Sequence, residues 1–148
     1  MILTFSKPVF KDQIISGHKR HTIREDKKER WRPYMDIHFW LHNPRNKSKN
    51  PHQFGKGICT GIEEILIDRN YNKPHGIGIY IGGRSLTPKE TEQLIQNDGL
   101  TPDQFRRWFL PPGEMEFYGR IIHWTNLSYS KNGNANSFKP LNSIPCTK

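Results

Sequence analysis

The residues with the clearest chemical potential lie in one short basic stretch, GHKRHTIRED, which runs from Gly17 to Asp26. Lys19 and Arg24 are cations suited to a phosphate group or a base carbonyl. Thr22 carries a hydroxyl group that becomes a nucleophile only when a nearby group takes its proton, and a desolvated lysine can do so. From residue type and spacing alone, a solvated basic turn is the simpler interpretation.

A carboxylate that could complete this group occurs in the stretch QNDGL, where Asp98 precedes Gly99. Such a carboxylate could shuttle a proton or hold the lysine in place. The alternative is an ordinary helix end, because Asp followed by Gly is common in turns. Spacing alone leaves both interpretations open.

The cysteines and histidines do not form a metal-binding pattern. Cys59 and Cys146 make no CxxC pair, and His38 and His42 fall in a predicted strand where they share a face without converging. We therefore expect no disulfide framework, no metal ion and no other cofactor.

Aromatic and basic residues next to each other indicate possible contacts with nucleic acid. Trp31 lies between Arg30 and Arg32, so we expect it to be the tryptophan least suited to the core and a candidate for base stacking. Trp40, in an alternating segment, fits the core better. Arg45, in the stretch NPRN, could follow a nucleic-acid backbone, although a solvated loop is the alternative.

The elements that must position these residues are mostly strands. Residues 2–5 form a short β-type run, and residues 7–16 predict a helix with Phe10 and Ile14 on one face and Gly17 as its stop. Phe105, Trp108 and Phe109 are expected in the core. The other predicted strands are 35–42, 57–68, 75–83 and 115–124, the other predicted helices are 87–99 and 101–109, and 43–57 is read as a long basic loop.

Length and charge bound the domain organisation and the class of partner. A chain of 148 residues with 33% hydrophobic residues predicts one domain, 1–125, followed by a polar tail, 126–148, that is flexible or loosely docked. The formal charge of +9 makes nucleic acid the leading class of partner, with RNA expected and DNA possible. No segment is long and apolar enough to span a bilayer, so we expect a cytoplasmic protein without a membrane partner.

Four ordered segments resemble a known family. The β-type LTF, the helix after it and the pattern G-x-K-x-x-T-I-R resemble the N-terminal signature of ASCH domains in the PUA-like superfamily. MDIHFWLHNPRN, NDGLTPDQFRRWF and EFYGRIIHW resemble later segments of the same family, in the same order. The resemblance covers residues 1–125.

The resemblance refines the expected fold and function. A mostly β order with inserted helices predicts an α+β domain, a small barrel-like sheet of about five or six strands flanked by two or three helices. The resemblance implies a PUA-like pseudo-barrel that binds RNA or a modified nucleoside in a basic cleft lined by Lys19, Thr22, Arg24 and Asp98. The remaining polar residues of the stretch, expected on its solvated side, are His18, Arg20 and His21.

Two other functions remain open. The family resemblance includes acetylcytidine amidohydrolases, which implies that Thr22 attacks the acetyl carbonyl, Lys19 takes its proton or stabilises the oxyanion, and Asp98 carries a proton to the leaving amine. The family acid is a Glu, one methylene longer than Asp98. The third possibility is a protein-interaction module whose basic face and polar tail recruit an acidic partner.

Overall fold

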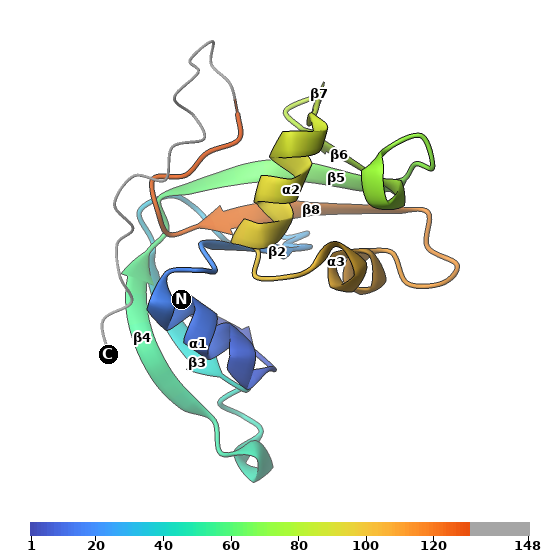
Figure 1. Cartoon of the computed structure of the whole chain (residues 1–148). Helices are drawn as coiled ribbons and strands as arrows, with labels where there is room; N and C mark the ends of the chain where they lie inside the picture. The colour runs from blue at the N-terminus through green and yellow to red at the C-terminus, as the bar shows by residue number, and fades with distance from the viewer. Residues whose placement is uncertain (131–148) are drawn as a thin grey trace.

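The computed structural model describes residues 1–130, which form three α-helices and eight β-strands (Figure 1). The helices are α1 (Pro8–Ser16), α2 (Pro88–Asn97) and α3 (Pro102–Phe109), with two 3-10 turns, η1 (Lys47–Lys49) and η2 (Pro74–Gly76). The strands are β1 (Ile2–Phe5), β2 (His21–Arg24), β3 (Asp36–Leu41), β4 (His52–Ile58), β5 (Gly61–Arg69), β6 (Ile77–Ile81), β7 (Arg84–Ser85) and β8 (Glu116–His123).

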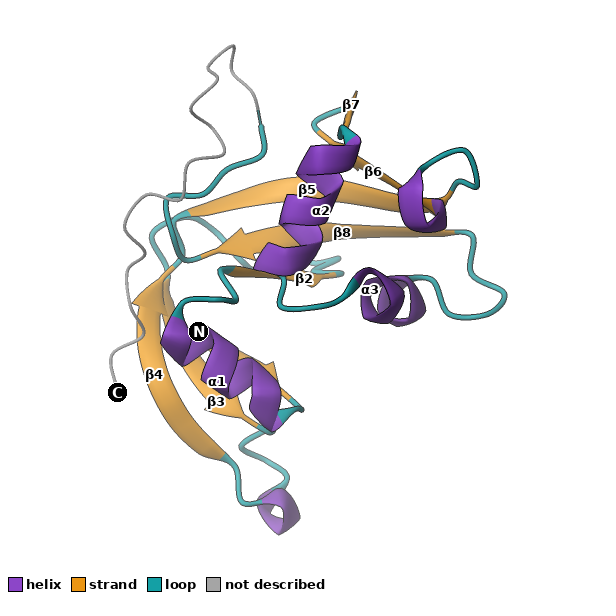
Figure 2. Ribbon diagram, in the orientation of Figure 1, coloured by secondary structure: helices purple, strands orange, loops and turns teal. Residues whose placement is uncertain are grey.

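The strands form two separate sheets. The smaller sheet has the order β1-β3-β4, with β1 parallel to β3, and the larger sheet has the order β2-β8-β5-β6-β7. In Figure 2, α2 and α3 lie over the larger sheet, whereas α1 lies over the smaller one. The predicted mostly β, α+β class is therefore confirmed, and the PUA-like pseudo-barrel stays a prediction because neither described sheet closes on itself.

The strand count is higher than the five or six predicted. β2 was hidden in the charged stretch after α1, and β4 occupies the second half of the segment read as a basic loop. Both strands obtain their backbone partners from distant segments: β2 pairs with β8, and β4 pairs with β3. Local composition did not indicate these two strands, because each forms by pairing with a strand from another part of the chain.

The buried apolar side chains form two hydrophobic clusters, and β8 of the larger sheet contributes to both. Side chains of β5 and β6 pack against α2 and α3, with Ile67, Leu94 and Phe105 fully buried. Side chains of the smaller sheet pack against α1, where Phe10 lies close to Phe5. The turn between α1 and β2 contacts the end of α2, where the amide of Arg20 donates to the carbonyl of Asn97.

The prediction that Trp31 is exposed for stacking is wrong. Its side chain is 5% exposed and belongs to the cluster of the smaller sheet. The backbone is held there by Asp26, whose Oδ2 accepts from the amide of Trp31 at 3.2 Å and from Nη1 of Arg120 at 2.7 Å. Its charged neighbours in sequence are exposed, so the chain turns Trp31 inward between two outward side chains.

The boundary between domain and tail lies later than residue 125. Leu127 and Tyr129 are 3% and 0% exposed and belong to the cluster under α2 and α3. The amide of Tyr129 donates to Glu63 Oε1 at 2.9 Å, which ties this segment to β5. These apolar contacts outweigh the polar composition that suggested a tail, so the folded domain reaches Ser130; the rest of the predicted tail lies outside the described residues.

This boundary can be tested by measuring stability. We expect Leu127→Ala to lower the free energy of unfolding by about 2–5 kcal/mol, because it removes a buried side chain from a packed cluster. Asn126→Ala, at the exposed neighbouring position, is the matched control and should change stability by less than about 0.5 kcal/mol. Equal urea midpoints for the two variants would show that the segment is a tail.

Candidate functional site

Four of the sequence-predicted residues line one pocket. Lys19, Thr22, Arg24 and Asp98 surround a space of about 200 Å³ between α1, β2 and the connection from α2 to α3. The apolar part of its wall consists of Phe5, Phe10, Ile23, Leu100, Trp108 and Phe109. Polar groups from two distant segments thus face a small and mostly aromatic chamber.

Local backbone geometry brings the basic stretch to this chamber. α1 ends at Gly17, which adopts a left-handed conformation with φ of 82°, and the turn after it is held by Arg20, whose amide donates to the carbonyl of Asn97 at 2.8 Å. Within residues 1–130, β2 pairs with β8 alone and forms one edge of the larger sheet. Thr22 and Arg24 are two residues apart on β2, so their side chains share one face of the strand, and both line the pocket.

The end of α2 brings Asp98 to the same place. Asp98 is the C-cap residue of α2, and Gly99 continues with φ of 80°. A Cβ atom on Gly99 would clash with the amide oxygen of Gln13 and approach Lys19. Asp98 and Gly99 therefore end α2 and also place the Asp98 carboxylate beside Lys19. The two interpretations that the sequence left open, a helix end and a functional carboxylate, both apply to Asp98.

Lys19 and Asp98 form a buried ion pair. Nζ of Lys19 donates to the backbone oxygen of Asp98 at 2.6 Å and to its Oδ1 at 3.2 Å, and both side chains are 3% exposed. The ammonium group also lies 5.0 Å from the ring centroid of Phe10. Desolvation lowers the pKa of Lys19 below its ordinary value, against the opposing effect of Asp98. The shorter acid therefore reaches the lysine.

Thr22 and Arg24 complete the polar side of the pocket in different ways. Within residues 1–130, the Thr22 hydroxyl makes no hydrogen bond, although its residue is only 5% exposed. Nη2 of Arg24 donates to the carbonyl of Thr4 at 2.6 Å, and its guanidinium lies 5.2 Å from the ring centroid of Phe5. Arg24 is thus fixed in the wall, and Thr22 is available to a ligand.

His21 belongs to the site, contrary to its predicted place on the solvated side. It is fully buried, with Nδ1 3.3 Å from Oδ1 of Asp98 and Nε2 2.6 Å from the hydroxyl of Tyr129. Desolvation lowers the pKa of His21 to about 4, so the imidazole is neutral at physiological pH. Strand alternation could have revealed it, because residue 21 shares a face of β2 with the buried Ile23.

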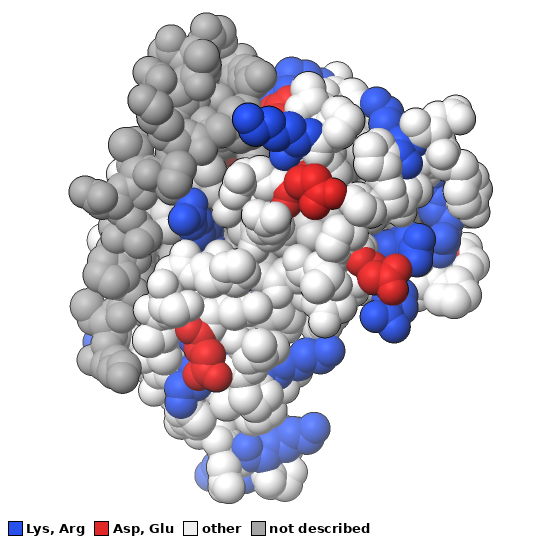
Figure 3. Space-filling view, in the orientation of Figure 1, with Lys and Arg blue, Asp and Glu red and all other residues white. Residues whose placement is uncertain are grey.

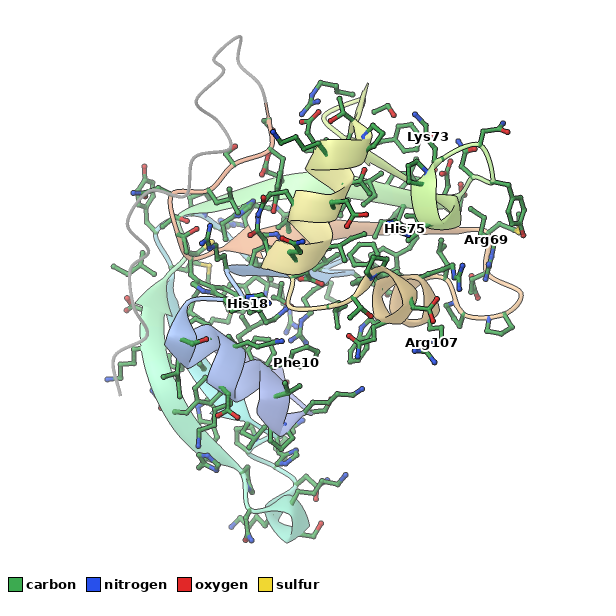
Figure 4. All side chains as sticks on the ribbon, viewed as in Figure 1. Phe10, His18, Arg69, Lys73, His75 and Arg107 are labelled. Atoms are coloured by element: carbon green, nitrogen blue, oxygen red, sulfur yellow. The ribbon has the colours of Figure 1, made fainter. Side chains whose placement is uncertain are left out.

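Trp108 is the third residue that sequence reasoning misplaced, after Trp31 and His21. It was expected in the core, but it is 46% exposed and lines the pocket, with its ring 5.8 Å from that of Phe10. Nζ of Lys7 lies 5.2 Å from its centroid. Figure 4 shows Phe10 on the side of α1 toward α3, and Arg107 on α3. Both residues line a groove next to Trp108. Arg45 is exposed in the turn after β3 and does not line this pocket.

Residues 1–130 contain no cluster of three or more His, Cys, Asp or Glu side chains suited to a metal ion. No helix in this range is long and apolar enough to cross a membrane. No family profile, curated protein or solved structure matches the chain.

The burial of neutral His21 makes stability depend on pH. Its pKa falls from 6.5 to about 4 on folding, so the unfolded chain binds more protons between these values. We expect the free energy of unfolding to be highest above pH 6.5 and to fall by up to about 3 kcal/mol on acidification to pH 4. Urea unfolding across this range is the measurement.

His21→Gln is the control, because it removes the titrating group. The variant should lose less stability over the same pH range, and a parallel loss in both proteins would contradict the assignment of the pH dependence to His21.

Glu63 affects stability at lower pH. Burial opposes its ionisation, but hydrogen bonds from His123, Ser130 and Tyr129 lower its pKa to about 2. Its contribution is lost only as pH falls below 4.5.

Proposed function

We propose that the pocket binds one modified nucleobase, carried by a nucleoside or by an RNA strand. The observation that carries this proposal is the combination of aromatic walls with the free hydroxyl of Thr22 and the buried pair of Lys19 and Asp98 in one small space. Proteins recognise single bases by stacking on aromatic rings and by hydrogen bonds to the base edge. A space of about 200 Å³ is smaller than typical drug-sized pockets and suits one planar ring system.

The surroundings of the pocket support an anionic ligand. The chain has a net charge of +9, and Figure 3 shows Lys and Arg side chains more widely spread than acids on the face that carries the three helices. Lys7 and Arg107 line a groove that continues the pocket past Trp108. The resemblance of residues 1–125 to ASCH domains supports the same class of ligand.

Binding can be measured with acetylcytidine, cytidine and short RNA and DNA oligonucleotides at low salt, by calorimetry and anisotropy. We expect Trp108→Ala to weaken binding roughly 5- to 100-fold through lost stacking, and Thr22→Val roughly 5-fold through one lost hydrogen bond. Tyr118→Ala removes an exposed aromatic outside the pocket and should keep wild-type affinity. Absence of binding to every probe would rule out the proposal.

A second candidate function is hydrolysis of an acylated base amine. The observation that favours it is an unbonded hydroxyl, that of Thr22, in the same pocket as a lysine whose pKa is lowered by burial. In this reaction Thr22 Oγ1 attacks the acyl carbon and neutral Lys19 takes its proton. The C–N bond then breaks, the amine leaves with a proton passed by way of Asp98, and water hydrolyses the acyl ester to free Thr22.

Turnover separates the two candidates. If the pocket is catalytic, purified protein converts acetylcytidine to cytidine and acetate, as seen by chromatography, at a rate that rises as Lys19 loses its proton below the ordinary lysine pKa of 10.5. Lys19→Met and Thr22→Val should lose at least about 100-fold in rate. Lys56→Met removes the same charge from the exposed face of β4 and should not. Binding without turnover would exclude catalysis and leave the binding function in place.

A further inference from the structure

A row of polar side chains runs from α2 to the carboxylate of Asp98. Nε2 of Gln93 donates to Oδ1 of Asn97 at 3.2 Å, and Nδ2 of Asn97 donates to the Tyr129 hydroxyl at 2.9 Å. That hydroxyl lies 2.6 Å from Nε2 of His21, whose Nδ1 is 3.3 Å from Oδ1 of Asp98. The last four members of the row are buried.

The acceptor at the end of the row determines where its protons lie. An ionised carboxylate only accepts hydrogen bonds, so Asp98 favours the proton on the His21 nitrogen that faces it, and a Tyr129 hydroxyl that donates to Nε2 favours the same tautomer. The contact at Nδ1 is a close approach and not a well-aligned hydrogen bond within the described residues. Nε2 then accepts from the hydroxyl of Tyr129, and the same phenol oxygen accepts from Asn97, so these two hydrogen bonds run in the same direction along the row.

We propose that Tyr129 and His21 are positioning residues, which hold Asp98 in place through the Nδ1–H tautomer of His21. Oδ1 of Asp98 is shared between this imidazole and Nζ of Lys19. When Lys19 is neutral, Nδ1–H still lies close to the carboxylate, at an Nδ1–Oδ1 distance of 3.3 Å, and its electrostatic attraction favours the same orientation of Asp98. The titratable or charged groups around His21 are Asp98, Lys19, His123 and Tyr129.

The backbone after β8 sets the position of the phenol. The amides of Tyr129 and Ser130 donate to the Glu63 carboxylate at 2.9 Å and 2.6 Å, and His123 Nε2 lies 2.7 Å from the same group. Glu63 is on β5, so the segment that carries Tyr129 is fastened to the centre of the larger sheet. The relay therefore includes a residue beyond the segments that resemble ASCH domains.

The tautomer can be observed directly by nitrogen-15 NMR of the histidine rings, in the protein without ligand. We expect His21 to show the Nδ1–H pattern at pH 7 in the wild type. Tyr129→Phe removes only the hydroxyl, and the variant should shift His21 toward the Nε2–H tautomer. Tyr118→Phe, at an exposed position on β8, should leave the wild-type pattern. An Nε2–H pattern in the wild type, or an unchanged pattern in Tyr129→Phe, would overturn the relay.

The role of the relay at the pocket rests on the proposed function and has its own readout. We expect Tyr129→Phe to weaken acetylcytidine binding about 3- to 10-fold, as for one lost hydrogen bond, with Tyr118→Phe unchanged. Wild-type affinity in Tyr129→Phe with an altered tautomer would overturn the positioning role. A wild type that shows the Nδ1–H pattern but binds no nucleoside would sink the proposed function while supporting the relay, since the tautomer is measured without ligand.

Discussion

The contact between the buried ammonium group of Lys19 and Asp98 joins two parts of the chain that are 79 residues apart. A buried cation is costly unless it is paired, and here one residue supplies both a backbone oxygen and a carboxylate. Because Asp98 caps α2, the pair also fixes the end of that helix against the turn after α1. Removing one partner leaves the other charge buried alone, so the geometry of the pocket and the stability of this junction are linked.

The aromatic wall has two effects on this pair. Phe5 and Phe10 exclude water from Lys19 and so favour its neutral form, while their ring faces attract its charged form. Desolvation lowers the pKa of Lys19 even though the Asp98 carboxylate acts in the opposite direction. Burial therefore makes the neutral form of Lys19 easier to reach than that of a solvent-exposed lysine.

Helices were predictable from local signals, and buried polar residues were not. Thr87 and Thr101 precede proline and form capping boxes at the starts of α2 and α3, as their sequence pattern indicates. His21 and Trp31 were placed on the surface because charged neighbours surround them in sequence. The hydrogen-bond partner of His21 is Tyr129, and that of the Trp31 carbonyl is Arg120 on β8. Both partners lie about 90 or more residues along the chain, so no local sequence pattern could reveal these contacts.

The position of β2 at the edge of the larger sheet has a consequence for folding. This strand of four residues pairs only with β8, in a register that joins Thr22 to Ile122. The pairing of Thr22 with Ile122 closes a longer loop than the pairing of β5 with β8, so it carries the larger loop-closure entropy with fewer paired residues to offset it. The wall that Thr22 and Arg24 give to the pocket therefore depends on a strand pairing that is shorter than the β5–β8 ladder of the same sheet.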